Sequence, residues 1–512
     1  MPLRPLNREQ TWLLPPTLDE LVPADHPARF MAEVVDGLER TTWSEMGVDI
    51  EGKPLGSPAY HPRGLLSVWL YGFMTGVRSS RKLEAACRDQ IPYLWLTGWQ
   101  RPDHNTLWRF YRDHRRAMRT LLKRTVHTAV GMGLVDMAVQ AVDGTKVMAN
   151  AAKDRTYDAE QLERLLERTE VAISDLEAQN EGGDDAPPPR LPQELTRAQD
   201  LRQKVRAAME RFVDEEGLRR VNLTDGDAEL MKSRQGIVTG YNAQAMVSPL
   251  DPDRAGASGL LITAAEVVND PDDHARLIPM VDQAQDNTGE PAGKTLGDAG
   301  YHSGANLQAC VERGQCVVMP ESQDKAMTQP YHKDRFAYDN TADTYACPQG
   351  QRLHFAGIKR RRGRMPMRVY RARGAVCRGC PAFGLCTTDR RQGRALEIGP
   401  HEAVLRTHRA WMATEEAKAA YRQRKELAEP VFGIVKDQQG ARRFLLRNLA
   451  NVSAEWTMLA TAFNLRTLWK VWASRLRPPP RFINGLGLGI TITQGDTSGR
   501  RHAPQLHPEP TQ

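Results

Sequence analysis

The sequence lacks a long, uninterrupted apolar run. The longest apolar stretch, from Leu65 to Val77, is too short and too interrupted to cross a bilayer, which needs about 20 apolar residues. The first residues, MPLRPLNREQTWLLPPTLDE, also lack the apolar core of a secretory signal. These absences exclude a membrane-spanning protein and predict a soluble, cytoplasmic one.

The sequence also has little excess charge and few cysteines. Lys and Arg number 70 against 63 Asp and Glu, a formal net charge of +7, so nucleic acid is permitted as a partner but not demanded. The seven cysteines are odd in number, and four of them lie between 347 and 386, which argues against a disulfide framework. We expect a metal site and scattered buried thiols in a reducing compartment.

The 512 residues are enough for about three or four domains. Residues 1–135 predict short helices joined by tight turns, including RGLLSVWLYGFMTGV, SSRKLEAACRDQ and a basic run after Asp103. These helices resemble a helix-turn-helix DNA-binding domain. The alternative is a packing or dimerisation domain with a solvated basic face. The basic residues of the third helix are Arg109, Arg112, Arg115 and Arg116.

After Met137 the periodicity changes from helical to extended. The run MAVQAVDGTKVMAN places Val139, Ala141 and Asp143 on one face of a strand that should end at Asp143-Gly144. Residues 151–225 then insert a helical hairpin, since apolar residues repeat at three and four on both sides of EGGDDAPPPRLP. The runs GIVTGYNAQAMVSP and GLLITAAEVVND extend the first strand into an antiparallel meander.

The next elements alternate between helix and strand. We expect a helix from about Asp272 to Gln285, kinked at Pro279, a short strand GKTLGDAG ending at Asp298, the helix SGANLQACVERG and the strand GQCVVMP. Three strands, helix, strand, helix, strand is the order of the ribonuclease-H-like α/β fold, a mixed five-stranded sheet with helices. Its first and fourth strands are neighbours, so Asp143 and Asp298 should meet at their carboxyl ends.

A Cys-rich segment, residues 322–400, separates the last strand from a further helical stretch. The cysteines in CPQGQ and CRGCPAFGLC suit a tetrahedral Zn²⁺ site, with unliganded thiols as the alternative. Between them, RLHFAGIKRRRGRMPMRVYRAR predicts a zinc-stapled β-hairpin that would have little core without the metal. The four cysteines are Cys347, Cys377, Cys380 and Cys386.

Paired aspartates at a sheet end suit a hard cation such as Mg²⁺, which prefers oxygen ligands. Either aspartate alone would more often be a turn or cap residue. Their joint placement at the ends of strands one and four favours the metal site. A third acid should come from the helix after the Cys-rich segment, and we expect Glu429, with Glu426 as its rival.

Four stretches in this order carry a resemblance to a known family. They are DGTK from Asp143, NLTDGDAELMKSRQGIVTGYNAQAMV from Asn222, GDAGY from Gly297 and YRQRKELAEPVFGIVK from Tyr421. They resemble bacterial insertion-sequence transposases with a DDE triad, in particular insertion-sequence family eleven-eighty-two. The resemblance spans about 13–475 and includes YHPRGLLSVWLYGFMTG, RPDHNTLWRFYRDH and EWTMLATAFNLRTL.

The resemblance implies a catalytic domain over residues 136–475 that holds two Mg²⁺ or Mn²⁺ ions per site on Asp143, Asp298 and Glu429. The family's tyrosine, arginine, glutamate, lysine signature falls on Tyr421, Arg424, Glu429 and Lys436, although four rather than three residues separate its arginine from its glutamate. The other three signature residues then contact DNA. Pro430 predicts a helix start or kink at the acid.

The implied function is cleavage of double-stranded DNA at the inverted repeats of an element and transfer into target DNA, by a homodimer in the bacterial cytoplasm. A metal-dependent nuclease and an inactive DNA-binding relic are the alternatives. Residues 476–512, rich in Pro, Gly and polar residues, should be disordered. The tip of the Cys-rich hairpin should contact DNA phosphates, unless it is a solvated loop. It consists of Lys359, Arg360, Arg361, Arg362 and Arg364.

Overall fold

The computed structural model describes most of the chain, and several predicted features fall outside the described part. Arg364 of the predicted tip and residues 477–512 of the predicted tail are among those outside, whereas Leu476, which was assigned to the tail, is the last residue of a helix. The described ranges are 17–52, 58–180, 193–215, 217–233, 236–256, 258–321, 329–362 and 365–476.

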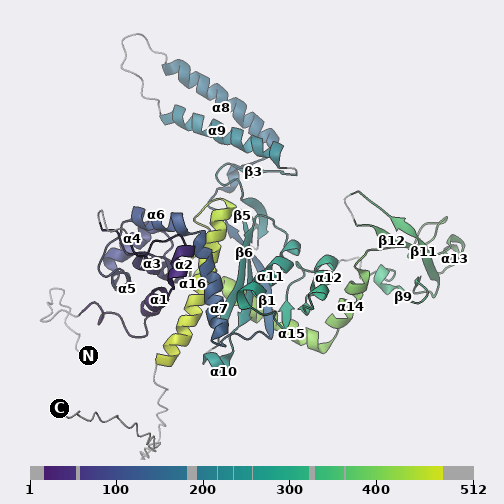
Figure 1. Ribbon diagram of the computed structural model, residues 1–512. Helices are drawn as coiled ribbons and strands as arrows, with labels where there is room; N and C mark the ends of the chain where they lie inside the picture. The colour runs from purple at the N-terminus through teal and green to yellow at the C-terminus, as the bar shows by residue number, and fades with distance from the viewer. Residues whose placement is uncertain are drawn as a thin grey trace, which may run out of the picture. The chain divides into compact units, whose positions relative to one another are not determined.

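A mixed six-stranded sheet carries the predicted meander (Figure 1). β5 is antiparallel to β1 and β6, while β7 and β8 continue the sheet in parallel beyond β1. The order is β6-β5-β1-β7-β8, and β4, which the sequence did not reveal, also pairs with β5. The predicted succession of three strands, helix, strand, helix, strand is confirmed. The strands are β1 (Val139–Met148), β4 (Glu229–Ser233), β5 (Gly236–Pro249), β6 (Leu260–Val268), β7 (Lys294–Leu296) and β8 (Val317–Val318).

Helices pack on both faces of this sheet. On one face α11 (Leu277–Thr288) and α12 (Gly304–Glu312) share a core with Val142 of β1. On the other, α15 (Glu415–Asp437) shares a core with Ala141. Because side chains alternate along a strand, Asp143 points to the α15 face together with Ala141, as predicted.

Two strand ends differ from the prediction. β1 continues past Asp143 to Met148 because its second half pairs with β5 even where β7 has ended. β7 ends at Leu296, so Asp298 lies in the loop that follows instead of closing the strand. Neither difference separates the two aspartates.

Two helix starts also differ. α11 begins at Leu277, not at Asp272, which puts Pro279 in the first turn, where its missing N–H costs no helical hydrogen bond. α15 begins at Glu415, so Glu429 and Pro430 lie inside the helix and not at its start. The prolines were correctly located in helices, but the helix bounds were not.

The amino-terminal helices share a core with the sheet. A helix begins after Asp103 as predicted, and Asp103 caps this helix, α6, by accepting from Thr106 N–H at 2.6 Å; a short 3₁₀ turn separates α6 from α7. α16 (Leu449–Leu476), buried on most sides, packs against α3, α7 and β6. The helices before the sheet are α1 (Pro27–Asp36), α2 (Arg40–Glu45), α3 (Pro62–Thr75), α4 (Ser80–Asp89), α5 (Ile91–Leu96), α6 (His104–His114) and α7 (Thr120–Gly131).

The insertion after β1 is the predicted helical hairpin. α8 (Ala159–Asn180) and α9 (Gln193–Asp214) pack on each other through Leu162 and Val205, and β2 (Thr156–Tyr157) pairs with β3 (Val221–Asn222) at their base. A single turn of helix, α10 (Pro252–Ala255), connects β5 to β6. In the part of the chain that the structure describes, no helix is long and apolar enough to cross a membrane.

The Cys-rich segment folds into more than the predicted hairpin. β11 and β12 form that hairpin, but they are the middle strands of a five-stranded antiparallel sheet. Tyr345, Leu353, Tyr370 and Leu396 form its core, so the expectation of little core without metal was wrong. α13 (Gly374–Arg378) lies within the segment and α14 (Glu402–Met412) follows it. The strands are β9 (Ala337–Asp339), β10 (Thr344–Ala346), β11 (Arg352–Lys359), β12 (Met367–Arg371) and β13 (Ala395–Ile398).

Candidate active site

Asp143 and Asp298 approach each other from two parallel strands. β1 and β7 pair with Ala141 opposite Leu296, and each aspartate comes two residues later along its own chain segment. Because parallel strands advance together, this register carries both carboxylates to the same end of the sheet.

The surroundings of Asp143 oppose its negative charge. Burial, the largest influence, raises the pKa of Asp143 from 3.8 to about 6, with Arg424 opposing the rise and Asp298 adding to it. Arg424 Nη1 lies 3.3 Å from Asp143 Oδ2, and Gly144 N–H donates to Oδ1 at 2.9 Å. The two aspartates are therefore within electrostatic reach of each other, with one guanidinium beside them.

A tight loop holds Asp298. Gly300 N–H donates to Asp298 Oδ1 at 2.8 Å, and Tyr301 N–H donates to the Asp298 carbonyl at 3.2 Å. A Cβ at position 300 would lie 2.9 Å from Asp298 Oδ1. Glycine at this position lets the backbone close around the carboxylate.

Helix α15 brings polar side chains onto β1. Lys436 Nζ donates to Thr145 Oγ1 at 2.5 Å and to the Lys146 carbonyl at 3.3 Å. Burial lowers the pKa of Arg424, but the charges of Asp143, Tyr421 and Asp298 outweigh burial and raise this pKa overall. Three of the four signature residues thus lie against or near the strand that carries Asp143.

The remaining signature residue, Glu429, has an exposed side chain on α15, and so does Glu426. Within the described ranges, no group of three or more His, Cys, Asp or Glu side chains stands close enough together to hold a metal ion. The triad, and the choice of Glu429 over Glu426, stay predictions.

Sequence reasoning missed the polar residues behind the aspartates. Asp273, Asn242 and Gln244 form one hydrogen-bonded cluster, and the Tyr301 hydroxyl donates to Gln244. The stretch GYNAQAMV contained the signal, because Asn242 and Gln244 alternate with apolar residues on a strand buried on both faces.

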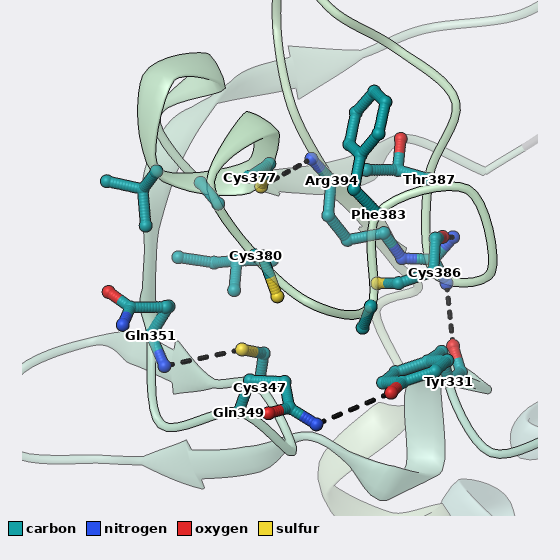
Figure 2. Close-up of a pocket in the computed structure, with 14 residues that line it drawn as sticks. Tyr331, Cys347, Gln349, Gln351, Cys377, Cys380, Phe383, Cys386, Thr387 and Arg394 are labelled. Atoms are coloured by element: carbon teal, nitrogen blue, oxygen red, sulfur yellow. Dashed lines mark hydrogen bonds between the residues drawn. The ribbon is translucent and has the colours of Figure 1, made fainter.

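The four cysteines line one small pocket at the end of the second sheet (Figure 2). Gln351 N–H donates to Cys347 Sγ at 3.3 Å and Arg394 N–H donates to Cys377 Sγ at 3.4 Å. Burial, more than any charge, raises the pKa of Cys386, and the neighbouring cysteines add to the rise. The four thiols thus line one space, with two backbone donors aimed at sulfur, although in the described part of the chain they do not stand close enough together to hold a metal ion.

The predicted cationic tip is partly neutralised. Lys359 forms an ion pair with Glu397 of β13, and Arg361 Nη2 lies 3.4 Å from Glu397 Oε2. Arg360 and Arg362 have exposed side chains. The tip therefore presents less net positive charge than its sequence predicts.

The basic residues of α6 and the turn after it divide in a similar way. Arg109, Arg112 and Arg116 are exposed, although Arg112 pairs with Asp113 at 2.7 Å. Arg115 is half-buried and donates to Asn451 Oδ1 at 2.8 Å, which ties this region to α16. Arg115 therefore contributes to packing, and the exposed cations remain candidates for contact with DNA.

Two family models match the chain. Residues 346–469 match "Transposase DDE domain", and residues 16–113 match "Transposase domain (DUF772)". The first match covers Glu429, Lys436 and the four cysteines, whereas Asp143 and Asp298 lie before it. No curated protein and no solved structure matches the chain.

Both matches are to transposase domains, and a transposase DDE domain indicates a DNA transposase. Within that class, the pair of matches confirms the resemblance to bacterial insertion-sequence transposases of the DDE type.

Proposed function

We propose that this transposase cuts DNA at the ends of its element and joins the freed 3′ ends to target DNA, with Asp143, Asp298 and Glu429 as catalytic acids. The observation that carries the proposal is the shared register of β1 and β7, which brings two aspartates together from distant parts of the chain. The sheet order β6-β5-β1-β7-β8, with β5 antiparallel, supports a ribonuclease-H-like core for residues 136–475.

The two aspartates fit a divalent cation. Both are carboxylates, the oxygen ligands that Mg²⁺ and Mn²⁺ prefer, and a cation beside them would relieve the repulsion that contributes to the raised pKa of Asp143. Asp143, Asp298 and Glu429 would hold two such ions. When bound, they supply Lewis acidity for phosphoryl transfer, activating the attacking oxygen and stabilising the leaving one.

The chain's own cations would bind the DNA strand. Lys436 contacts Thr145 and Lys146 of β1, the strand that carries Asp143, and its ammonium can pair there with a phosphate. Arg424, which contacts Asp143 in the free protein, would exchange that contact for phosphate oxygens when DNA arrives, and Tyr421 lies close to this guanidinium.

A structural Zn²⁺ would be held by Cys347, Cys377, Cys380 and Cys386. Their sulfurs surround one pocket, and N–H groups that donate to sulfur stabilise the thiolate form that Zn²⁺ requires. Unliganded thiols are the alternative.

Double-stranded DNA would contact two further surfaces, the exposed arginines of the amino-terminal helices and the tip of the Cys-rich sheet. Arg360 and Arg362 are the tip residues available for phosphates, while Lys359 and Arg361 share Glu397. Pairing two element ends would require a homodimer.

Strand transfer distinguishes a transposase from a nuclease on the same fold. The protein is incubated with Mg²⁺, a pre-cut element end and a circular target, and joined products are counted. A second sample carries a 3′-deoxy end, which offers no hydroxyl for attack. Joining that depends on the 3′-hydroxyl supports a transposase, nicking of the circular target without joining indicates a nuclease, and binding alone indicates an inactive relic.

A further inference from the structure

Position 144, directly after the first catalytic aspartate, leaves space for a buried amide. A Cβ on Gly144 would lie 2.4 Å from Gln244 Nε2 and 3.0 Å from its Cδ. Gln244 is opposite Gly144 in the β1–β5 pair and is fully buried. Gly144 is therefore required because the Gln244 side chain occupies the space that a Cβ at position 144 would need.

The Gln244 side chain is hydrogen-bonded at both ends. Its Nε2 donates to Asn242 Oδ1 at 2.9 Å and to Asp273 Oδ1 at 2.8 Å. Its Oε1 accepts from the Tyr301 hydroxyl. We call these four side chains, of Asn242, Gln244, Asp273 and Tyr301, the Gln244 network. Such a buried network is rigid only when its members are satisfied.

Asp273 connects the network to the Asp298 loop. Its Oδ1 also accepts from Asn242 Nδ2 at 2.6 Å, and Lys146 Nζ lies 3.4 Å away. Its Oδ2 faces that loop, because a Cβ on Gly300 would lie 3.5 Å from Asp273 Oδ2 and 2.9 Å from Asp298 Oδ1. The two carboxylates thus flank the same glycine.

Tyr301 makes the second connection. Its ring is fully buried, its hydroxyl reaches Gln244, and its backbone N–H donates to the Asp298 carbonyl. Asn306 Nδ2 donates to the carbonyl of Tyr301 at 2.7 Å and to that of His274 at 2.6 Å. The loop after β7 is therefore fixed to the 3₁₀ turn that precedes α11 as well as to β5.

We propose that the Gln244 network is a positioning device that sets the place of Asp298 relative to Asp143, and with it the affinity of the site for divalent cations. The proposal rests on the proposed function, since it concerns the same two acids. None of the four side chains is assigned to the reacting atoms. They act through the Asp298 loop and through the strand that carries Asp143.

A role in stability alone is the competing explanation, and a matched pair of tyrosines separates the two. Tyr301→Phe removes the hydroxyl that reaches Gln244. Tyr241→Phe removes a hydroxyl from another fully buried tyrosine of the core. This hydroxyl donates to Asp225 Oδ1 at 2.8 Å and is not part of the Gln244 network. Each variant loses one buried hydrogen bond.

The test measures Mn²⁺ affinity by titration calorimetry without DNA, cleavage rate, DNA affinity and melting temperature. Tyr301→Phe is expected to weaken Mn²⁺ binding about 10-fold or more, the usual effect of losing support behind a ligand, and to slow cleavage while DNA affinity is kept. Tyr241→Phe should lower the melting temperature comparably and keep wild-type Mn²⁺ affinity.

Asp298→Asn in the same series separates this proposal from the proposed function. If Tyr301→Phe matches wild type while Asp298→Asn loses Mn²⁺ binding and cleavage, the positioning role is wrong and the proposed function stands. If Tyr241→Phe weakens Mn²⁺ binding as much as Tyr301→Phe does, the network only stabilises the fold. If Asp298→Asn behaves as wild type, both proposals fail.

Discussion

At the scale of single residues, the charge of Asp143 is opposed by burial and balanced by one guanidinium. Burial raises its pKa to about 6, with Arg424 opposing the rise and Asp298 adding to it. Asp143 is therefore partly protonated in the metal-free protein near pH 6, and it binds a cation more readily as the pH rises. Neither the burial nor the Arg424 contact is visible in the sequence, because both depend on how α15 packs.

This shift predicts a pH-dependent stability. Between about pH 4 and pH 6 the folded protein retains on Asp143 a proton that the unfolded chain releases, so stability falls as the pH rises through that window. Asp143→Asn cannot ionise and lacks this fall. Without divalent cations, the unfolding free energy of Asp143→Asn minus that of wild type should therefore increase by up to about 3 kcal/mol from about pH 4 to about pH 7.5. Urea unfolding titrations of both proteins in the presence of a chelator measure these free energies. The same difference between variant and wild type at both pH values would contradict the prediction.

At the scale of elements, some strands of the Cys-rich sheet could be predicted from the sequence and others could not. The spacing of CPQGQ and CRGCPAFGLC located a cysteine cluster, and the run around RRRGR located the hairpin of β11 and β12. The flanking strands were missed because β9, β10 and β13 are only three or four residues long, too short for a periodic pattern. The aromatic core they add is the reason that the segment does not depend on metal alone for packing.

The zinc proposal predicts one zinc ion per chain in protein purified without chelator. Replacing Cys377 and Cys380 with Ser should remove the zinc and loosen the Cys-rich sheet while Asp143 and its surroundings keep their structure. Cys316→Ser is the control, since this half-buried cysteine lies outside the segment. Metal analysis decides the question, and zinc retained by the double variant would exclude this site.

The tip proposal predicts opposite effects for two changes. Replacing Arg360 and Arg362 with Ala should weaken binding to element ends and to random DNA about equally, and the slope of affinity against salt should become shallower by roughly 0.9 for each phosphate that is no longer neutralised. Glu397→Gln frees Lys359 and Arg361 and should strengthen binding. Affinities over a salt series test both changes. No effect from either would make the tip a solvated loop, and selective weakening at the element end would make it a base reader.

At the scale of the whole molecule, a buried ion pair joins distant parts of the chain. Arg78, just after α3, contacts Glu455 of α16 at 2.6 Å, and both side chains are almost fully buried. Glu455 also accepts N–H groups from Leu445 and Leu446, and Arg78 donates to the Arg443 carbonyl at 3.1 Å. The pair thus fixes the loop after α15 between the amino-terminal helices and α16. Only tertiary structure brings these residues together, so the sequence did not predict it.

Arg78→Ala should therefore destabilise the protein by about 3–5 kcal/mol, because it leaves a buried carboxylate without its partner. Arg40→Ala, which breaks an exposed ion pair with Glu51, should have little effect. Chemical unfolding of both variants measures the difference. Similar losses of stability in the two variants would mean that burial of the Arg78 pair does not matter.

Much of the six-stranded sheet could be predicted because its strands carry strong periodic patterns. The order of β1, β5, β6, β7 and β8 followed from those patterns, and topology then brought Asp143 and Asp298 together. The polar residues behind the site were not predicted, because a buried Gln or Asn in a strand does not reveal its partners. Glu429 is the acid whose role depends most on the family signature, since its side chain is exposed.

The central claim, that Asp143, Asp298 and Glu429 act together on DNA, is tested most directly by single-turnover cleavage of a duplex that carries the element end in Mg²⁺. Asp143→Asn, Asp298→Asn and Glu429→Gln should each abolish cleavage while DNA affinity stays near that of wild type. Glu426→Gln, a change of the neighbouring exposed acid on α15, should cleave normally. Near-normal cleavage by any of the first three variants would remove that residue from the triad, and loss of cleavage in Glu426→Gln alone would move the third acid to Glu426.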